Sequence, residues 1–166
     1  MKFLHPPTNA MVNAGLFVLR LTLFTIFIVH GSQKMLGWFG GHGFQATVTG
    51  FTHGMHIPLI FALLAIFTEF LAPLALLVGL LTRPAALGLL VVMLVAAIKV
   101  HIANGFFMNW GGHQRGEGVE FFILGTGIAL ALIIGGAGAW SLDALVGKRI
   151  RQQQNKPVIE KVATIA

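Results

Sequence analysis

The most informative segment of the chain is FALLAIFTEFLAPLALLVGLL, residues Phe61–Leu81. It contains 21 residues and a single charged side chain, Glu69, near its middle. About 20 apolar residues in an α-helix, at about 1.5 Å each, cross the hydrocarbon core of a bilayer. A carboxylate half-way along such a helix costs roughly 2.5–3.5 kcal/mol on insertion scales, so it indicates a functional site and requires a partner. The segment therefore predicts a membrane-spanning helix whose acidic residue pairs with another part of the chain.

The composition agrees with a membrane protein of one domain. Of the 166 residues, 56% are hydrophobic and 10% are charged, whereas soluble domains carry about 25% charged residues. The net charge of +6 does not indicate nucleic-acid binding, because five of the eleven Lys and Arg residues follow Trp140. In that position they bear on membrane orientation. The sequence has no cysteine, which excludes thiol catalysis, disulfides and iron–sulfur ligation by this chain.

Three further apolar segments have the length of membrane spans, so the predicted fold is an all-α, four-transmembrane-helix bundle. We divide the chain into a membrane domain, residues 1–145, and a basic tail, residues 146–166. The predicted spans cover about residues 13–35, 58–81, 85–107 and 119–137.

The connecting segments have distinct compositions. The loop after the first span is rich in glycine, histidine and aromatic residues, and a short amphipathic helix is expected at Phe44–Phe51. The residues Thr82-Arg83-Pro84 predict a tight turn between the second and third spans. Ser141 is expected to cap a short amphipathic helix suited to an anionic membrane surface, and residues 153–166 are expected to be loose.

The distribution of positive charge predicts the orientation in the membrane. Four spans place both termini on one side, which carries seven Lys and Arg residues, while the other side carries only Lys34 and Arg115. Positive charge accumulates on the cytoplasmic side of membrane proteins. We therefore predict that both termini are cytoplasmic and that the histidine-rich loop is on the outer side.

Polar side chains within the spans are predicted to meet toward the outer side. A rotation of about 100° per residue places Arg20, His30 and Lys34 on one face of the first span. Counted from the outer ends of the spans, Arg20 and Glu69 differ in depth by about 6 Å, and Lys99 lies on the other side of Glu69. Arg pairs with carboxylates in a bidentate geometry. We therefore expect Glu69 to pair with Arg20 in preference to Lys99.

The third span carries its polar residues on different faces. Lys99 and His101 are separated by about 200° around a helix, so they are not expected to face one interior point. His101 shares its face with Asn104, and this face is predicted to be the one in the bundle. Lys99 then extends around a neighbouring helix or toward the surface.

Histidines suggest two further kinds of site. His30 and His101 lie at matched depth, as ligation of a b-type haem requires, although a histidine near a membrane interface is more often hydrogen-bonded structure. In the outer loop, His53 and His56 have a spacing compatible with two metal ligands. His42 is also in that loop, but no carboxylate or cysteine is there to complete a site, so no metal ligand is assigned.

Several stretches together resemble the DoxX family of small four-span bacterial membrane proteins. The resemblance covers about residues 13–145 and implies a four-helix bundle in the bacterial cytoplasmic (inner) membrane. The stretches are Arg20 in the first span, HGSQKMLG (30–37), TEFLAPLALLVGLLTRPAALGLLVVM (68–93), KVHIANGFF (99–107), GEGVEF (116–121) and GAGAWSLD (136–143). The positions that match the family pattern are Arg20, Gly31, Lys34, Glu69, Gly79, Arg83, His101 and Glu120.

The resemblance also implies a function. Some relatives are subunits of quinone-linked oxidoreductases, including thiosulfate:quinone oxidoreductase and an archaeal terminal quinol oxidase. Others are associated with oxidative-stress responses, and most have no assigned activity. We therefore expect a membrane subunit that binds a quinone and acts with partner subunits or as a homo-oligomer. Without cysteine, the chain cannot itself hold sulfur as a persulfide.

Within this hypothesis the intramembrane residues take separate roles. The candidate catalytic residues are Glu69 and Glu120, which relay protons, and His101, which binds the carbonyl end of the quinone together with Lys99. Arg20 is expected to keep Glu69 ionised. The candidate cofactor-binding residues are Arg20, His30, Lys34, Lys99 and Asn104.

Two other functions stay open on the sequence. The same charges can fix the register of the helices in a non-catalytic membrane scaffold or assembly subunit. A pathway for protons or solutes requires a continuous polar route. The inner half of the predicted bundle has few polar groups beyond Arg20, which disfavours a pore.

Overall fold

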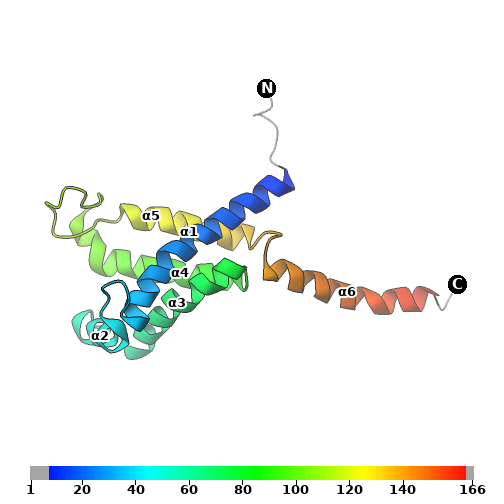
Figure 1. The fold of residues 1–166 in the computed structure, drawn as a ribbon, viewed down its shortest axis with the longest axis horizontal. Coiled ribbons are helices and arrows are strands. Elements are labelled where there is room, and N and C mark those ends of the chain that lie inside the picture. Colours follow the sequence, from blue (N-terminus) through cyan, green and yellow to red (C-terminus); the bar gives the residue numbers. More distant parts are fainter. Residues whose placement is uncertain (1–7, 164–166) are drawn as a thin grey trace, which may run out of the picture.

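The structure is a computed structural model that describes residues 8–163, and throughout this range its regular elements are helices (Figure 1). In chain order they are α1 (Asn9–Leu36), α2 (Gly43–Thr49), the π-helix η2 (Gly50–Gly54), α3 (Leu59–Val78), α4 (Thr82–Ala96), the π-helix η3 (Ala97–His101), the 3₁₀-helix η4 (Ile102–Asn104), α5 (Glu120–Gly135) and α6 (Leu142–Ala163).

Helices occur at all four predicted apolar segments. Three of them are long and apolar enough to cross a membrane: α1, α3 and the continuous run Thr82–Asn104. The fourth, α5, is apolar but has only 16 residues. The helix expected at Phe44–Phe51 is present as α2 and η2.

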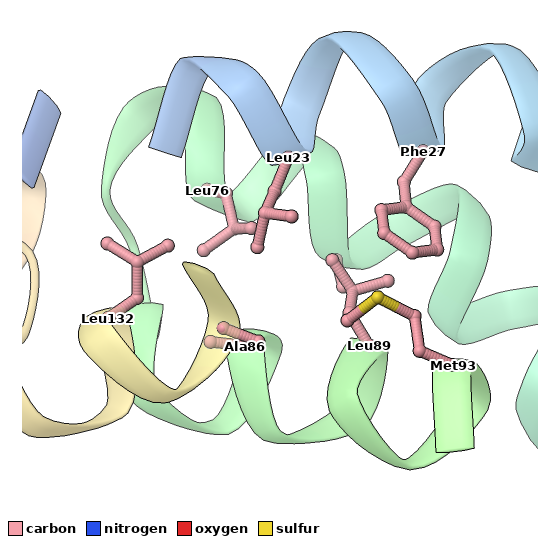
Figure 2. Close-up of a cluster of buried hydrophobic side chains, with 9 residues drawn as sticks. Leu23, Phe27, Leu76, Ala86, Leu89, Met93 and Leu132 are labelled. Atoms are coloured by element: carbon pink, nitrogen blue, oxygen red, sulfur yellow. The ribbon is translucent and has the colours of Figure 1, made fainter. Parts of the chain in front are cut away.

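The helices pack as two pairs, α1 with α3 and α4 with α5, and α3 also contacts α4. Their apolar side chains meet in one cluster, to which α1 contributes Leu23, α3 contributes Leu76 and α5 contributes Leu132 (Figure 2). Leu89 and Met93 of α4 complete its centre, and all five side chains are at most 2% exposed. We call the end of the bundle that contains the turn 79–81 and the link 136–141 the closed end, and the opposite end the open end.

Burial in this protein differs from that of a soluble domain outside the apolar cluster. Arg20 and Glu69 are buried, at 1% and 5% exposure, while apolar residues such as Leu64 and Leu71 are more than half exposed. Soluble proteins almost never bury such charges fully unless they are paired. Polar residues that face a bundle interior and leucines that face outward are the arrangement expected in lipid.

The turn between α3 and α4 lies three residues before its predicted position. It comprises Gly79–Leu81, with left-handed backbone at Gly79 (φ +67°) and Leu81 (φ +50°). The residues Thr82-Arg83-Pro84, predicted to be the turn, are the first three residues of α4. Proline is tolerated in the first turn of a helix, where backbone N–H groups have no intrahelical acceptor.

The C-terminal segment also differs from the prediction. Instead of a short helix with a loose end, α6 continues to Ala163 and leaves the bundle as a single rod (Figure 1). Glutamine, lysine and arginine are good helix formers, which explains the continuation through Gln152–Gln154. Leu142, Leu145 and Ile150 are exposed along its first part.

A glycine permits the close approach of α1 and α3. A methyl group at Gly31 would lie 2.6 Å from the carbonyl carbon of Glu69 and 2.7 Å from the Cα of Phe70. Both are backbone atoms, so a clash there cannot be relieved by turning a side chain. Gly31 therefore fixes the separation of the two helices at the level of Glu69.

We predict that Gly31→Ala destabilises the protein by about 1–3 kcal/mol, because overpacking forces the two backbones apart. The measurement is the free energy of unfolding in detergent micelles. The matched control is Gly15→Ala in the same helix, where no atom lies within 4 Å of the added methyl group. That variant should be neutral or slightly stabilised. Equal destabilisation of the two variants would contradict the role of Gly31.

Candidate functional site

A large cavity opens between the two helix pairs toward the open end. Its volume is about 990 Å³. Most of its wall is apolar and comes from α1, α3, α4 and the start of α5. Phe51 of η2 and Met55, which directly follows η2, also line it. The polar side chains on the wall are His30, Lys34, Thr68, Glu69, Lys99, His101 and Glu117.

The cavity brings five of the predicted site residues together. They come from three elements: two from α1, one from α3 and two from η3. The other three predicted residues, Arg20, Asn104 and Glu120, do not line it. The five are His30, Lys34, Glu69, Lys99 and His101.

Glu69 forms an ion pair with Lys34. The Glu69 side chain is 6% exposed and the Lys34 side chain is 25% exposed. The pair joins α1 to α3 one helical turn beyond Gly31, where the two backbones are closest. The prediction that Arg20 pairs with Glu69 and keeps it ionised is therefore wrong.

The error comes from assuming that the spans end at the same depth. Glu69 lies beside Gly31, which is five residues from the end of α1 but ten residues from the start of α3. The helix α3 therefore extends about 7 Å further than α1 toward the open end. Eleven residues, or about 16 Å of helix, separate Arg20 from the level of Glu69.

Arg20 is instead buried at the closed end. Its Nη2 donates a hydrogen bond to the carbonyl oxygen of Trp140 at 2.6 Å, and its guanidinium lies 5.4 Å from the centre of the Phe17 ring. A Cβ at Gly79 would collide with this guanidinium, so only glycine fits there. Nε and Nη1 of Arg20 have no hydrogen-bond partner among the described residues.

Asp143 completes the closed end. Its carboxylate accepts hydrogen bonds from the backbone N–H groups of Leu81, at 2.8 Å, and Thr82, at 3.0 Å. These N–H groups lie at the N-terminus of α4, where they have no acceptor within the helix. Asp143, which is distant in the sequence, therefore caps α4. Asp143 also attracts Arg20 electrostatically. This role of Asp143 is not predicted from the sequence, because an aspartate that caps a distant helix has no signature in local spacing.

His101 is held at the opposite end of the α4–η4 run. Its Nδ1 lies 2.8 Å from the backbone carbonyl oxygen of Glu117, and its ring is 4.4 Å from that of Phe122, centre to centre. Asn104 donates to the same carbonyl oxygen at 3.1 Å. Asn104 therefore positions the loop that carries Glu117.

Glu120 also forms a hydrogen bond with this loop. Its carboxylate accepts a hydrogen bond from the backbone N–H of Met108 at 3.2 Å, and the carboxylate of Glu117 accepts one from Asn109 at 2.6 Å. Met108 itself lines the cavity. Glu117 lies in the GEGVEF segment, but its role is not predicted from the sequence because its contacts depend on the loop conformation.

Lys99 and His101 both line the cavity, contrary to the expectation that they cannot face one interior point. They lie in η3, a π-helix with i→i+5 hydrogen bonds. Residues two apart lie on nearly opposite sides of a π-helix, as they do in an α-helix, so the helix type does not bring these two side chains together. Both line the cavity because it is wide enough to be reached from two directions by side chains of this length.

The histidines of the other loop stay apart from the cavity. His42, His53 and His56 are all exposed. Within residues 8–163, no group of three or more histidine, aspartate or glutamate side chains comes together as a candidate metal site.

The fold and the cavity define a helical integral membrane protein with inward-facing charges. The model of the DoxX family matches residues 15–102, and the chain belongs to this family. It is 30% identical over 131 residues to the inner membrane protein YphA of Escherichia coli (strain K12), covering 77% of this chain and 87% of the relative. No solved structure matches the chain. The protein is thus a multi-pass protein of the bacterial inner membrane.

We predict that Lys34→Met costs about 3 kcal/mol of stability, because it leaves the Glu69 carboxylate buried without its partner. This is the lower end of the range for buried pairs, since Lys34 is partly exposed. The double variant Lys34→Met/Glu69→Gln should recover most of that loss. A double-mutant cycle of unfolding in micelles measures the coupling. Additive effects of the two substitutions would show that the pair contributes nothing.

Proposed function

We propose that the protein is the membrane subunit of a quinone-linked oxidoreductase and that its cavity binds the quinone. The observation that carries the proposal is the cavity itself. Ligand sites are typically apolar clefts of roughly 300–1,000 Å³ with a few placed polar groups. At about 990 Å³, with apolar walls and Lys34, Glu69 and His101 on them, this cavity fits a lipid-soluble ligand that has a polar head.

A quinone, when bound, supplies the chemistry of a carrier of two electrons and two protons. In our proposal Lys34, not Arg20, is the ionic partner of Glu69, and the Glu69 carboxylate accepts a proton from the head group. Lys99 faces the same space as a cation. We keep Glu120 as the candidate that relays protons toward the open end. It lies next to the cavity wall, since its carboxylate accepts a hydrogen bond from the backbone N–H of Met108, which lines the cavity. Arg20 has a structural role in this scheme.

The proposed function requires partners. Electrons must arrive from, or leave to, another redox group, and the sequence offers no cysteine for a cluster or a thiol. We propose that partner subunits or a second copy of the chain provide this group. The alternative, a scaffold or assembly subunit, agrees with the structural role of Arg20 and predicts that the cavity takes membrane lipid only.

We further propose that all four apolar helices cross the membrane, with both termini in the cytoplasm. The start of α1 and the end of α5 meet at one end of the bundle, where the N–H of Ala139 donates to the side chain of Asn13 at 2.9 Å. That end carries Arg83 and the basic residues of α6. The helix α5 is about 24 Å long, which is shorter than the hydrocarbon core of a bilayer. Local thinning of the bilayer around α5 accommodates this difference in length.

The orientation can be tested with single cysteines, because the natural chain has none. We expect His53→Cys to react with a membrane-impermeant maleimide when the reagent reaches only the outer face of the inner membrane, as in spheroplasts. Lys148→Cys should react only after the membrane is permeabilised. Both positions are exposed in the structure. Labelling in the reverse order would overturn the proposed orientation.

Ligand binding is tested by extracting the purified protein and recording its optical spectrum. We expect a lipid-soluble quinone in the extract, and we expect Ala65→Phe, which fills the cavity, to reduce its amount at least about tenfold. The control Leu74→Phe lies on the same helix outside the cavity wall and should retain the ligand.

The other outcomes of this experiment are equally informative. A haem Soret band would assign the cavity to haem and its ligation to His30 and His101. If the extract contains only phospholipid and the wild-type protein binds no added quinone, the quinone proposal fails and the scaffold function is favoured.

A further inference from the structure

The hydrogen bond of His101 fixes which ring nitrogen carries its proton. Nδ1 lies 2.8 Å from the backbone carbonyl oxygen of Glu117. A carbonyl oxygen can only accept a hydrogen bond, so Nδ1 must be the donor. In the neutral imidazole, Nε2 then has a lone pair and no proton.

The same ring is oriented by a second contact. The aromatic ring of Phe122 lies 4.4 Å from it, and Asn104 donates to the same Glu117 carbonyl at 3.1 Å, which steadies the acceptor. His101 lines the cavity, and no described residue hydrogen-bonds to its Nε2. Nε2 is therefore the ring nitrogen that remains for a ligand, and in the neutral ring it is an acceptor.

We propose that His101 determines the oxidation state of the ligand that the cavity selects, an inference that rests on the proposed quinone function. The hydroxyl of a hydroquinone donates to Nε2. The oxidised quinone has a carbonyl oxygen at this position, and neither this oxygen nor Nε2 of the neutral ring can donate a hydrogen bond. On binding the quinone, Nε2 would lose its hydrogen bond to water and gain none from the ligand. The resting site thus prefers a head group with a donor hydroxyl, and the earlier assignment of His101 to the quinone carbonyl is reversed.

The remaining charged groups do not cancel this preference. The Lys34 ammonium is engaged by Glu69, and the carboxylate of Glu117 accepts the N–H of Asn109. Lys99 can donate to either form of the ligand or stabilise an anion formed by loss of the hydroxyl proton. The titratable groups that face the cavity with His101 are His30, Lys34, Glu69, Lys99 and Glu117.

The test uses the full-length protein in nanodiscs under anaerobic conditions with three probes of equal tail length: an alkyl hydroquinone, its oxidised quinone and its dimethyl ether, which cannot donate. At pH 8 we expect the hydroquinone to bind about tenfold more tightly than either acceptor-only probe. Equilibrium dialysis gives the three dissociation constants.

Variants assign the preference to His101. His101→Gln, which has both a donor and an acceptor, should bind the hydroquinone and the quinone equally. The control His53→Gln, outside the cavity, should keep the wild-type preference. Persistence of the preference in His101→Gln would overturn the assignment.

Two further results keep the test decisive. Nitrogen NMR of the labelled wild-type protein should show His101 protonated at Nδ1 and not at Nε2 at pH 8, and the opposite tautomer would refute the inference without any variant. If the wild-type protein binds none of the probes, the proposed quinone function fails. If it binds hydroquinone and quinone equally, only the selectivity fails.

Discussion

One buried guanidinium determines how the helices of this protein converge. Arg20 sits inside an apolar bundle, where a charge must find acceptors within the protein, and it finds the carbonyl oxygen of Trp140. This bond ties α1 to the link between α5 and α6, and the guanidinium occupies the space left by the missing side chain of Gly79 at the end of α3. All four apolar helices meet around this point, whereas the cavity lies toward the other end, between the pair α1–α3 and the pair α4–α5.

The protein therefore uses its two most buried charges in different ways. Arg20 is enclosed, with its hydrogen bond directed to the backbone, so it contributes to architecture. Glu69 is equally inaccessible to solvent, but it and its partner Lys34 form part of a cavity wall. An ion pair on a cavity wall can exchange a proton or a hydrogen bond with a ligand, which an enclosed guanidinium cannot do. This separation, about 16 Å along α1, distinguishes the structural site from the candidate binding site.

The positions of the helices could be predicted from the sequence because long apolar runs leave few alternatives in a bilayer. The choice of Glu69, Lys34 and His101 as site residues followed from the high cost of polar groups inside such runs. The pairing of Arg20 could not be predicted, because it depends on the offset between the ends of α1 and α3. The presence of both Lys99 and His101 on the cavity wall could not be predicted, because it depends on the width of the cavity, which helical periodicity does not give. The role of Asp143 depends on tertiary contacts alone.

The π-helix η3 has a consequence for how such a site can arise. A π-turn holds one residue more than an α-turn, so it is the expected product of a single-codon insertion in an α-helical segment. Everything before η3, including the core residues Leu89 and Met93, keeps its register through such an event, while every residue after it rotates as a block. One insertion can thus turn His101 into the cavity without disturbing the core, and one deletion can remove it. Relatives with the same bundle can in this way gain or lose a histidine on the cavity wall in a single genetic step.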